Sequence, residues 1–187
     1  MILAGETERL VLQPLAIGDA TQIQELFPRW EIVRYLQKIV PWPYPEDGAL
    51  HFVRDVALPA IERGDQWTWT LRLKSAPHEI IGCLDLRKGE ADNRGFWLAP
   101  EWQARGLMSE ACAWANDFWF DQLGFPVLRV AKARADTASR RISEKHSMRL
   151  VGTTEKDYVS GHLPSETWEI TAEEWRTWKA RAARTLH

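Results

Sequence analysis

The part of the chain that most clearly suggests a chemical function is the join between an apolar run and a helical pattern. Phe96, Trp97 and Leu98 form a run that is typical of a buried strand. Pro100 ends the strand because proline has no backbone N–H to donate. From Ser109 onward apolar residues recur every three or four positions, which indicates a helix whose first N–H groups favour an anion such as phosphate. The join consists of Gln103, Ala104, Arg105, Gly106, Leu107 and Met108.

This join matches neither of the two common phosphate-binding loops. A P-loop requires Gly-x-x-x-x-Gly-Lys-Ser/Thr and a dinucleotide loop requires Gly-x-Gly-x-x-Gly, and the single Gly106 satisfies neither pattern. Gly106 still lets a phosphate approach the backbone closely, and the Arg105 side chain can add positive charge. The alternative is a tight turn from strand to helix that carries a surface arginine.

Asp85 is the strongest candidate for a side chain that accepts a proton. It lies in the otherwise apolar segment Gly82-Cys-Leu-Asp-Leu86, where an unpaired carboxylate is costly and its pKa rises. A carboxylate with a raised pKa can act as a general base or anchor an amine. Glu90 and Asp92, on the turn that follows, are the next candidates. The alternative is an Asp85 that forms a salt bridge at the surface of a sheet.

Several other chemistries lack the residues that they need. The five histidines form no His-x-x-x-His or His-Glu-x-x-His pair, and two isolated cysteines make no zinc ligand set, so we expect no metal. The chain contains no Gly-x-Ser-x-Gly turn of a hydrolase. Aromatic and basic residues do not interleave as single-stranded nucleic acid binding requires.

Composition indicates an ordinary globular protein. With 187 residues, 45% hydrophobic and 27% charged, the chain is most simply one domain over residues 1–187. A net charge of -2 provides no general attraction to nucleic acid or to an anionic membrane, so we expect neither as a partner. Cys83 and Cys112 fall in predicted strand and helix positions, and the N-terminus lacks signal-peptide features. We therefore expect a cytoplasmic protein without disulfides or membrane spans.

Eleven tryptophans are the unusual feature of the composition. Trp30, Trp42, Trp67 and Trp69 gather in the first half of the chain. There they can line an apolar binding cleft as well as fill a core. The nearby connector Val40-Pro-Trp-Pro-Tyr-Pro45 cannot be helical, because its prolines fix φ and restrain their neighbours, so we expect a stiff aromatic loop.

The predicted elements describe a mixed α and β protein. Three consecutive strands with short links indicate an antiparallel meander. The strand after the central helix is expected to lie parallel to the strand before it, because a helix connects the two. Strands are predicted at 9–15, 67–73, 80–86, 95–98, 127–134, 149–151, 158–159 and 167–170. Helices are predicted at 19–27, 30–36, 46–63, from 109 to a stop at 124–126, at 137–146 and at 173–186.

Three motifs in consistent order and spacing resemble those of the GNAT superfamily of acyl-CoA-dependent N-acyltransferases. The join 103–108 resembles the family's pyrophosphate loop, Gln/Arg-x-x-Gly-x-Gly/Ala, with Met108 at the last small position. Glu8-Arg-Leu-Val-Leu resembles the opening of the branch that includes RimJ/RimL-type ribosomal-protein N-terminal acetyltransferases. Asp136-Thr-Ala-Ser139 with Glu144-Lys145 resembles that branch's second signature, Asn-x-x-Ser followed by Glu-Lys-x-Gly. The resemblance extends over nearly the whole chain.

The resemblance implies an α+β, GNAT-like fold with a central, mostly antiparallel twisted sheet of about seven strands and helices on both faces. It implies an N-acetyltransferase that moves an acetyl or similar short acyl group from acyl-CoA to a primary amine, by direct attack in a ternary complex. The backbone of Phe96, Trp97 and Leu98 would hold the pantetheine arm and polarise the thioester. The N–H groups from Gln103 to Met108 would hold the pyrophosphate. Asp136 would contact the cofactor or cap a helix.

The resemblance also assigns catalytic roles. Ser139 matches a serine that relays a proton to the leaving thiolate, and a structural serine at a helix start is the alternative. The family often places Glu two residues before the glycine that matches Gly95, but here that residue is Asn93, which cannot take a proton. We therefore assign Asp85 as the substitute base or amine anchor. The missing Glu also leaves open a non-catalytic acyl-CoA-binding or sensor module.

The acceptor amine and the oligomeric state are open, a dimer included. The branch resemblance implies a protein N-terminus as acceptor, whereas the aromatic loop at 40–45 can equally enclose a hydrophobic small molecule. A basic run lies beside the place where family substrates bind. We expect some of it to meet the CoA 3′-phosphate and most of it to be solvated. The run comprises Arg129, Lys132, Arg134, Arg140, Arg141 and Lys145.

Overall fold

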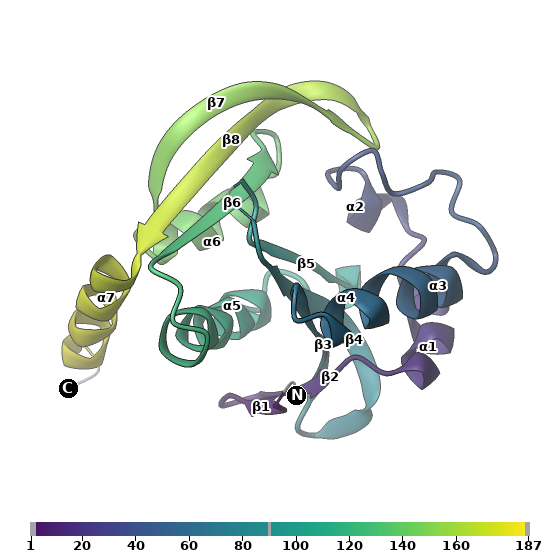
Figure 1. Cartoon of the computed structure of the whole chain (residues 1–187), viewed down its shortest axis with the longest axis horizontal. Helices are drawn as coiled ribbons and strands as arrows, with labels where there is room; N and C mark the ends of the chain where they lie inside the picture. The colour runs from purple at the N-terminus through teal and green to yellow at the C-terminus, as the bar shows by residue number, and fades with distance from the viewer. Residues whose placement is uncertain (1–2, 90, 186–187) are drawn as a thin grey trace.

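The computed structural model describes residues 3–89 and 91–185, and its strands form two antiparallel sheets (Figure 1). The larger sheet has the order β1-β2-β3-β4-β5 and the smaller one the order β6-β8-β7. The predicted mostly antiparallel arrangement is present, but the strands divide into two sheets because β5 and β6 do not pair as the expected parallel neighbours. The strands are β1 (Gly5–Glu6), β2 (Leu10–Pro14), β3 (Gln66–Leu73), β4 (Ala76–Arg87), β5 (Arg94–Leu98), β6 (Val127–Ala133), β7 (Arg149–Tyr158) and β8 (Gly161–Thr171).

Helices cover both faces of the larger sheet (Figure 1). Helix α5 packs against one face, where it contacts β2 and β4, and α1 and α4 pack against the other. Pro59 lies in the first turn of α4, and a π-helical turn at Phe52–Ala57 joins α3 to α4, so the predicted helix 46–63 is divided near its proline. The helices are α1 (Ala20–Leu26), α2 (Trp30–Val33), α3 (Gly48–His51), α4 (Leu58–Glu62), α5 (Leu107–Asp117), α6 (Thr137–Lys145) and α7 (Ala172–Thr185).

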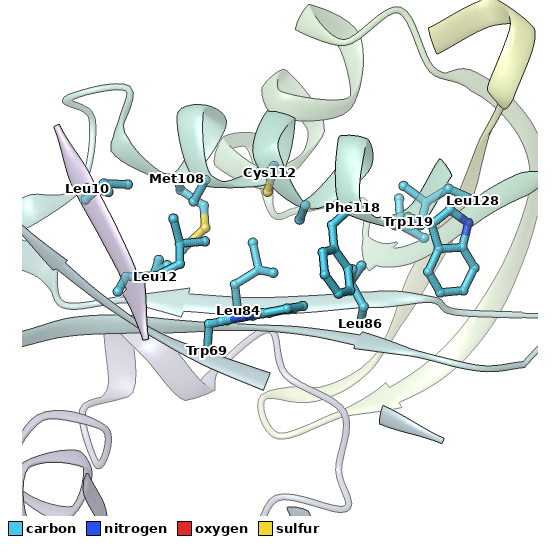
Figure 2. Packing of buried hydrophobic residues seen from close by; sticks show 14 of the residues in the cluster. Leu10, Leu12, Trp69, Leu84, Leu86, Met108, Cys112, Phe118, Trp119 and Leu128 are labelled. Carbon is cyan, nitrogen blue, oxygen red and sulfur yellow. The ribbon is translucent and has the colours of Figure 1, made fainter. Parts of the chain in front are cut away.

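Alternation along β4 builds a separate core on each face of the larger sheet. Leu84 and Leu86 belong to the cluster under α5, together with Met108 (Figure 2). Cys83 belongs to the cluster under α1 to α4. Because neighbouring side chains of a strand point to opposite faces, Asp85 lies on the same face as Cys83. The two cores therefore define an α5 side and an α1–α4 side of the sheet.

The tryptophans of the first half have separate roles. Trp69 is fully buried and packs edge to face against Trp114 of α5, with the ring centroids 5.1 Å apart. Trp67 packs against the same core. Of the two roles that the sequence leaves open for these residues, the structure shows core packing, complete for Trp69 and partial for Trp67. Trp30 and Trp42 remain 44% and 43% exposed, with ring centroids 5.7 Å apart.

The hairpin of β7 and β8 links the smaller sheet to the α2 region (Figure 1). Its tip bonds to the segment after α2, where the Lys38 N–H donates to the Asp157 carbonyl at 3.1 Å and the Val159 N–H to the Leu36 carbonyl at 2.9 Å. Both strands are longer than predicted. Much of β7 is exposed, so alternation of apolar and polar residues could not mark its extent.

Candidate active site

Strands β5 and β6 approach each other at one end and then separate. At the closed end the Asn93 N–H donates to the Arg129 carbonyl at 2.7 Å, and Asn93 Oδ1 accepts from the Arg129 N–H at 2.8 Å. The Asp92 carboxylate accepts from the Ala131 N–H at 3.0 Å. Beyond these bonds the strands belong to different sheets. We call this divergence the β5–β6 fork.

Asn93 uses its polar groups to hold the fork closed at this end. Its side-chain amide donates to the carbonyls of Arg87, at 3.2 Å, and Gly89, at 2.8 Å, and the residue is 2% exposed. A glutamate could not make these donations, because an ionised carboxylate only accepts hydrogen bonds. The position that often holds a base in the resembling family therefore has a structural role in this chain.

The outer half of β5 has one free edge. Phe96, Trp97 and Leu98 pair with Leu84, Cys83 and Gly82 of β4. Toward β6 the described part of the chain provides no paired strand for them. Buried backbone groups need hydrogen-bond partners, so this edge suits an extended molecule that lies along it. The role of these three residues in holding pantetheine stays a prediction.

The loop from β5 to α5 presents an open helix start. Ala104 and Gly106 both adopt left-handed backbone, with φ of 59° and 78°. Gln103 holds the loop by donating from Nε2 to the Leu98 carbonyl at 2.8 Å. Within 4 Å, a Cβ built on Gly106 would meet only Nη2 of Arg9, at 3.5 Å. Among the described residues, the position next to the Gly106 backbone is therefore nearly empty of side chains.

The other loop residues contribute in different ways. Leu107 and Met108 are 3% and 7% exposed, so their side chains fill the core and leave only their backbone for an anion. This explains how Met108 can stand where the family pattern has a small residue. Arg105 is exposed, and its guanidinium lies over the ring of Trp102, 4.9 Å from the centroid.

Arg9 is a contact to this loop that the sequence reasoning missed as a site residue. Its Nη1 donates to the Arg105 carbonyl at 3.0 Å, and its Nε lies 2.8 Å from the Glu110 carboxylate. The Thr7 hydroxyl also donates to Glu110. Burial raises the pKa of Glu110, but these hydrogen bonds outweigh it and leave the pKa below its usual value. The negative charge of Glu110 at the helix start is thus paired with Arg9.

Asp85 belongs to β4 and lies opposite Gly95 of β5, on the α1–α4 side of the fork. Its Oδ2 is 2.8 Å from Nε of Arg87 but at an angle that makes no hydrogen bond. Nη2 of Arg87 is 3.5 Å from Oδ2 of Asp92, which also accepts from Nε2 of Gln37 at 3.2 Å. A Cβ on Gly95 would lie 2.8 Å from Oδ1 of Asp85, so only glycine leaves room for this carboxylate.

Burial raises the pKa of Asp85, and the cation of Arg87 offsets only part of that rise. Burial likewise raises the pKa of Asp92, against the effect of Arg87. One cation lies between two carboxylates in this cluster of Asp85, Arg87 and Asp92. When both carboxylates are ionised, the negative charge in excess can pair with a second cation, such as an ammonium group. The predicted candidate Glu90 lies outside the described residues.

Ser139 lies on the α5 side of the fork, in the first turn of α6. Its N–H donates to the Asp136 carboxylate at 3.0 Å, so Asp136 caps this helix. The Ser139 carbonyl accepts from Nζ of Lys132 at 3.0 Å. Ser139 is 8% exposed. The cap observed for Asp136 is one of its two expected roles, and the proton relay through Ser139 stays a prediction.

The expectation of a mainly solvated basic run is wrong for Lys132. This residue is 6% exposed, because the alternation of β6 turns its side chain toward α6. Arg129 and Arg140 are paired with Glu169 and Glu166, at 2.7 and 2.9 Å. Arg134, Arg141 and Lys145 are exposed as predicted.

Two antiparallel sheets that separate at β5 and β6, with the start of α5 beside the separation, make up the fold of this chain. The family model described as acetyltransferase (GNAT) domain matches residues 9–149. The chain therefore belongs to the GNAT acetyltransferase family and is a GNAT N-acetyltransferase. The resemblance and the α+β fold predicted from the sequence are confirmed, with eight strands in two sheets.

Solved structures at low sequence identity share this fold. RimJ of Mycobacterium smegmatis, solved in complex with CoA-disulfide, has a TM-score of 0.80 at 16% identity over 97% of this chain and 94% of that chain. Ribosomal-protein-S5-alanine acetyltransferase from Vibrio fischeri has a TM-score of 0.77 at 15% identity, over 92% and 98% of the chains. RimL, a ribosomal L7/L12 alpha-N-protein acetyltransferase solved with coenzyme A, has a TM-score of 0.75 at 14% identity, over 88% and 95%. No curated protein matches this sequence.

Residues 3–89 and 91–185 contain no group of three or more His, Cys, Asp and Glu side chains that could hold a metal ion. Over the same ranges no helix has the length and apolar character needed to cross a membrane.

Proposed function

We propose that this acetyltransferase moves the acetyl group of acetyl-CoA to the α-amino group of a protein N-terminus. The observation that carries the proposal is the β5–β6 fork. It joins the open helix start at Gly106, on the α5 side, to the Asp85, Arg87 and Asp92 cluster on the α1–α4 side. An acyl donor that enters from the first side can meet an ammonium group held on the second.

The reaction on these residues balances without a metal ion or redox partner. Asp85 takes a proton from the bound ammonium, and the neutral amine then attacks the thioester carbonyl carbon. A C–N bond forms, the C–S bond breaks, and the outward N–H groups of β5 stabilise the oxyanion between these events. The hydroxyl of Ser139 gives its proton to the departing thiolate, and the proton that the attacking nitrogen loses on becoming the amide returns to Ser139 through water. Residues 103–108 bind the diphosphate through backbone N–H groups and the helix dipole.

A protein N-terminus is the acceptor class that the neighbours support. Three of the similar structures are named as ribosomal-protein acetyltransferases, one acting on an alanine of S5 and one on the α-amino group of L7/L12. Those activities belong to those proteins, at 12 to 15% identity. The acidic cluster of this chain is compatible with the same chemistry, because it can hold an ammonium group.

A small aromatic amine is the second candidate acceptor. An aromatic line runs from the 40–45 loop to β5, since Tyr44 lies 5.0 Å from Phe27 and Phe27 lies 5.4 Å from Trp97, ring centroid to ring centroid. Trp30 and Trp42 lie exposed at the outer end. An apolar amine would gain contact area along this line.

The test is release of free CoA thiol from acetyl-CoA with matched acceptors. We would compare peptides that begin with alanine or serine, the same peptides with a blocked N-terminus and one internal lysine, and small arylalkyl amines. Turnover of the free N-termini supports the proposal. Turnover of arylalkyl amines alone moves the assignment to the second candidate. Tight CoA binding without turnover of any amine would contradict both. A single domain over residues 1–187, the cytoplasmic location and the oligomeric state stay predictions.

A further inference from the structure

Gly82 of β4 occupies a place in the larger sheet where a side chain has no room. A Cβ built on Gly82 would lie 2.4 Å from the carbonyl oxygen of Trp97 and 3.1 Å from Cα of Leu98, two backbone atoms of β5. Carbon and oxygen atoms of neighbouring strands normally stay about 3.3–3.6 Å apart. The Trp97 oxygen therefore occupies space that any other residue at position 82 would need for its side chain.

Two other strand glycines show that this close approach of backbone is particular to Gly82. On Gly95 a Cβ would meet the end of the Asp85 side chain, at 2.8 Å, and a side chain can turn to another rotamer. On Gly152 a Cβ would meet only Cβ of Thr167, at 4.0 Å, which is ordinary contact. A carbonyl inside a strand pair has no such freedom. A residue larger than glycine at position 82 would therefore have to move the backbone of β5 or of β4.

The empty space lies on the α5 side of the larger sheet. Leu84 belongs to the core under α5, and Gly82, two residues earlier in β4, points to the same side. Ile81, where the register with β3 shifts, and Leu98, which pairs with Gly82, belong to this core as well. The Trp97 oxygen therefore leans out of the strand pair toward the α5 side, from which the proposed donor enters.

The Trp97 carbonyl and the Leu98 N–H belong to one planar peptide group, so they turn together. The Ala99 N–H donates to the Ile81 carbonyl at 2.8 Å, which makes the neighbouring pair of Leu98 and Gly82 a non-hydrogen-bonded pair. The residue of such a pair turns its N–H and C=O away from the partner strand. The Leu98 N–H is thus on the edge of β5 toward the fork, and the peptide that fills the space at Gly82 sets its direction.

The backbone on both sides of this peptide is held in place. Phe96 pairs with Leu84 before it, and the Leu98 carbonyl after it accepts from Nε2 of Gln103 at 2.8 Å. A side chain added to β4 here would therefore turn the peptide between Trp97 and Leu98 more readily than it would shift the whole strand. In the described ranges no strand pairs with this half of β5 from the side of β6, so no sheet partner opposes the turn.

We propose that Gly82 is a positioning residue for the acyl donor, because the absence of its side chain sets the direction in which the Leu98 N–H meets the pantetheine arm. The role of Gly82 rests on the proposed function, since the donor must lie along β5. Pantetheine contains amide carbonyls, and a hydrogen bond to one of them weakens steeply when the N–H turns away. A turned peptide would lose this contact and leave the diphosphate contacts of residues 103–108 intact.

The test compares two ligands on the full chain. One is CoA, and the other is adenosine 3′-phosphate 5′-diphosphate, the part of CoA that lacks pantetheine. Calorimetry gives the dissociation constants of both ligands for the wild type and for Gly82→Ala. The substitution should weaken CoA binding about tenfold, equivalent to ~1.4 kcal/mol. It should change the affinity for the shorter ligand by less than about twofold, because that ligand does not reach Leu98.

Gly152→Ala is the matched control. Gly152 also lies in a strand, and a Cβ there has room. Both substitutions remove the same backbone freedom from the unfolded chain. The control should bind both ligands as the wild type does.

The outcomes separate the role of Gly82 from the proposed function. Equal CoA affinity in the wild type and Gly82→Ala would overturn the positioning role. An equal loss of affinity for both ligands would overturn it too, because that is the effect of a general disturbance of the sheet. If the wild type binds CoA no more tightly than the shorter ligand, pantetheine does not lie on β5. In that case the donor part of the proposed function falls together with the positioning role.

A measurement on the wild type applies even if Gly82→Ala does not fold. Amide hydrogen exchange of Leu98, followed by NMR, should slow by about tenfold or more on saturation with CoA and not with the shorter ligand. Cys83, which pairs with Trp97 inside the ladder, is the reference, and its exchange should respond alike to both ligands. Exchange of Leu98 that CoA does not slow, or that both ligands slow equally, would overturn the contact through which Gly82 acts.

Discussion

The two sides of the β5–β6 fork differ in the kind of chemical group that they present, backbone groups on one side and charged side chains on the other. On the α5 side the groups that we propose to bind the donor are mainly backbone: the unpaired edge of Phe96–Leu98 and the helix start at Gly106. On the α1–α4 side they are charged side chains, the carboxylates of Asp85 and Asp92 with Arg87 between them. Most substitutions keep the backbone N–H and C=O groups of a residue, but every substitution replaces its side chain. We therefore expect acceptor chemistry to fail by single substitutions that leave donor binding intact.

Asp85→Asn should give the largest effect and sharpen this contrast. Removing a general base lowers turnover by about 10²–10⁴-fold, while the dissociation constant of CoA should not change because Asp85 lies on the other face of the sheet. Because burial raises the pKa of Asp85, activity of the wild type should increase as pH rises through a value above the usual carboxylate range. Steady-state rates between pH 5 and 9 and calorimetry with CoA measure both quantities.

Asp65→Asn is the control for that substitution, because Asp65 pairs with Arg63 at the surface, outside the fork. It should keep both the rate and the acid limb of the pH profile. A folded Asp85→Asn protein with the wild-type rate and the same acid limb would remove Asp85 from the mechanism and leave Asp92 as the next carboxylate to test.

Ser139→Ala tests whether the contrast between the two sides holds, because Ser139 would contribute a catalytic side chain on the α5 side. If its hydroxyl protonates the leaving thiolate, turnover should fall by about 10²-fold, the lower end expected for general acid catalysis. CoA affinity should stay the same. Thr137→Ala, in the same helical turn but exposed, is the control. An unchanged rate in Ser139→Ala would leave this serine with a structural role at the helix start and make the α5 side wholly backbone.

Gly106→Ala should act on donor binding alone. Gly106 has φ of 78°, and an L-residue pays about 1–2 kcal/mol for left-handed backbone. The free loop should relax away from this conformation, so CoA binding must restore it and weakens by about five- to thirtyfold. Turnover at saturating acetyl-CoA should stay near the wild-type value. The measurement is the dissociation constant of CoA beside the saturated rate.

Gly124→Ala is the matched control, because Gly124 has φ of 72° and lies beyond the far end of α5. Both substitutions put an L-residue at a position that favours left-handed backbone, so any general effect of such a change on the protein should appear in both variants. Only Gly106→Ala should weaken CoA. Equal CoA affinity in the two variants would mean that the helix start does not contact the diphosphate.

The backbone side of the fork was largely predictable from the sequence, and the side-chain side was not. Local patterns place the strand at Phe96 and the helix after Gly106, because apolar spacing and Pro100 act over a few residues. The contact of Arg9 with the Arg105 carbonyl joins residues far apart in the chain, and local spacing contains no signal for it. The burial of Lys132 depends on which face of β6 receives α6. That packing is set by the tertiary structure and not by the local sequence.

Asp85 falls between these cases. Its position in an apolar strand correctly indicated a pKa raised by burial, although the side chain is only partly buried, with 25% of its surface exposed. The salt bridge named as the alternative is present too, with Arg87. The sequence could not show that Gly95 is opposite Asp85, because the register of β4 and β5 is set by the sheet as a whole. It is this register that brings the carboxylate to the fork.

His146 provides the smallest expected effect and tests the packing behind the α5 side. Burial lowers the pKa of His146 to about 3 from an ordinary value of 6.5. Between these two values the unfolded chain binds a proton that the folded protein does not. The free energy of unfolding should therefore fall as pH falls from 6.5 toward 3, by at most about 1.4 kcal/mol per pH unit from this residue.

His146→Gln removes that titration and retains a polar side chain that can reach the Ser109 hydroxyl, which lies 3.4 Å from Nε2 of His146. Urea unfolding at pH 7, 6, 5 and 4 should give a shallower pH dependence in the variant than in the wild type, since the carboxylates contribute equally to both. His162→Gln is the control, because His162 is exposed on the β7–β8 hairpin and paired with Asp157. Parallel curves for His146→Gln and wild type would show that His146 takes up its proton without unfolding, and hence that the space between α5 and α6 admits charge more readily than its burial implies.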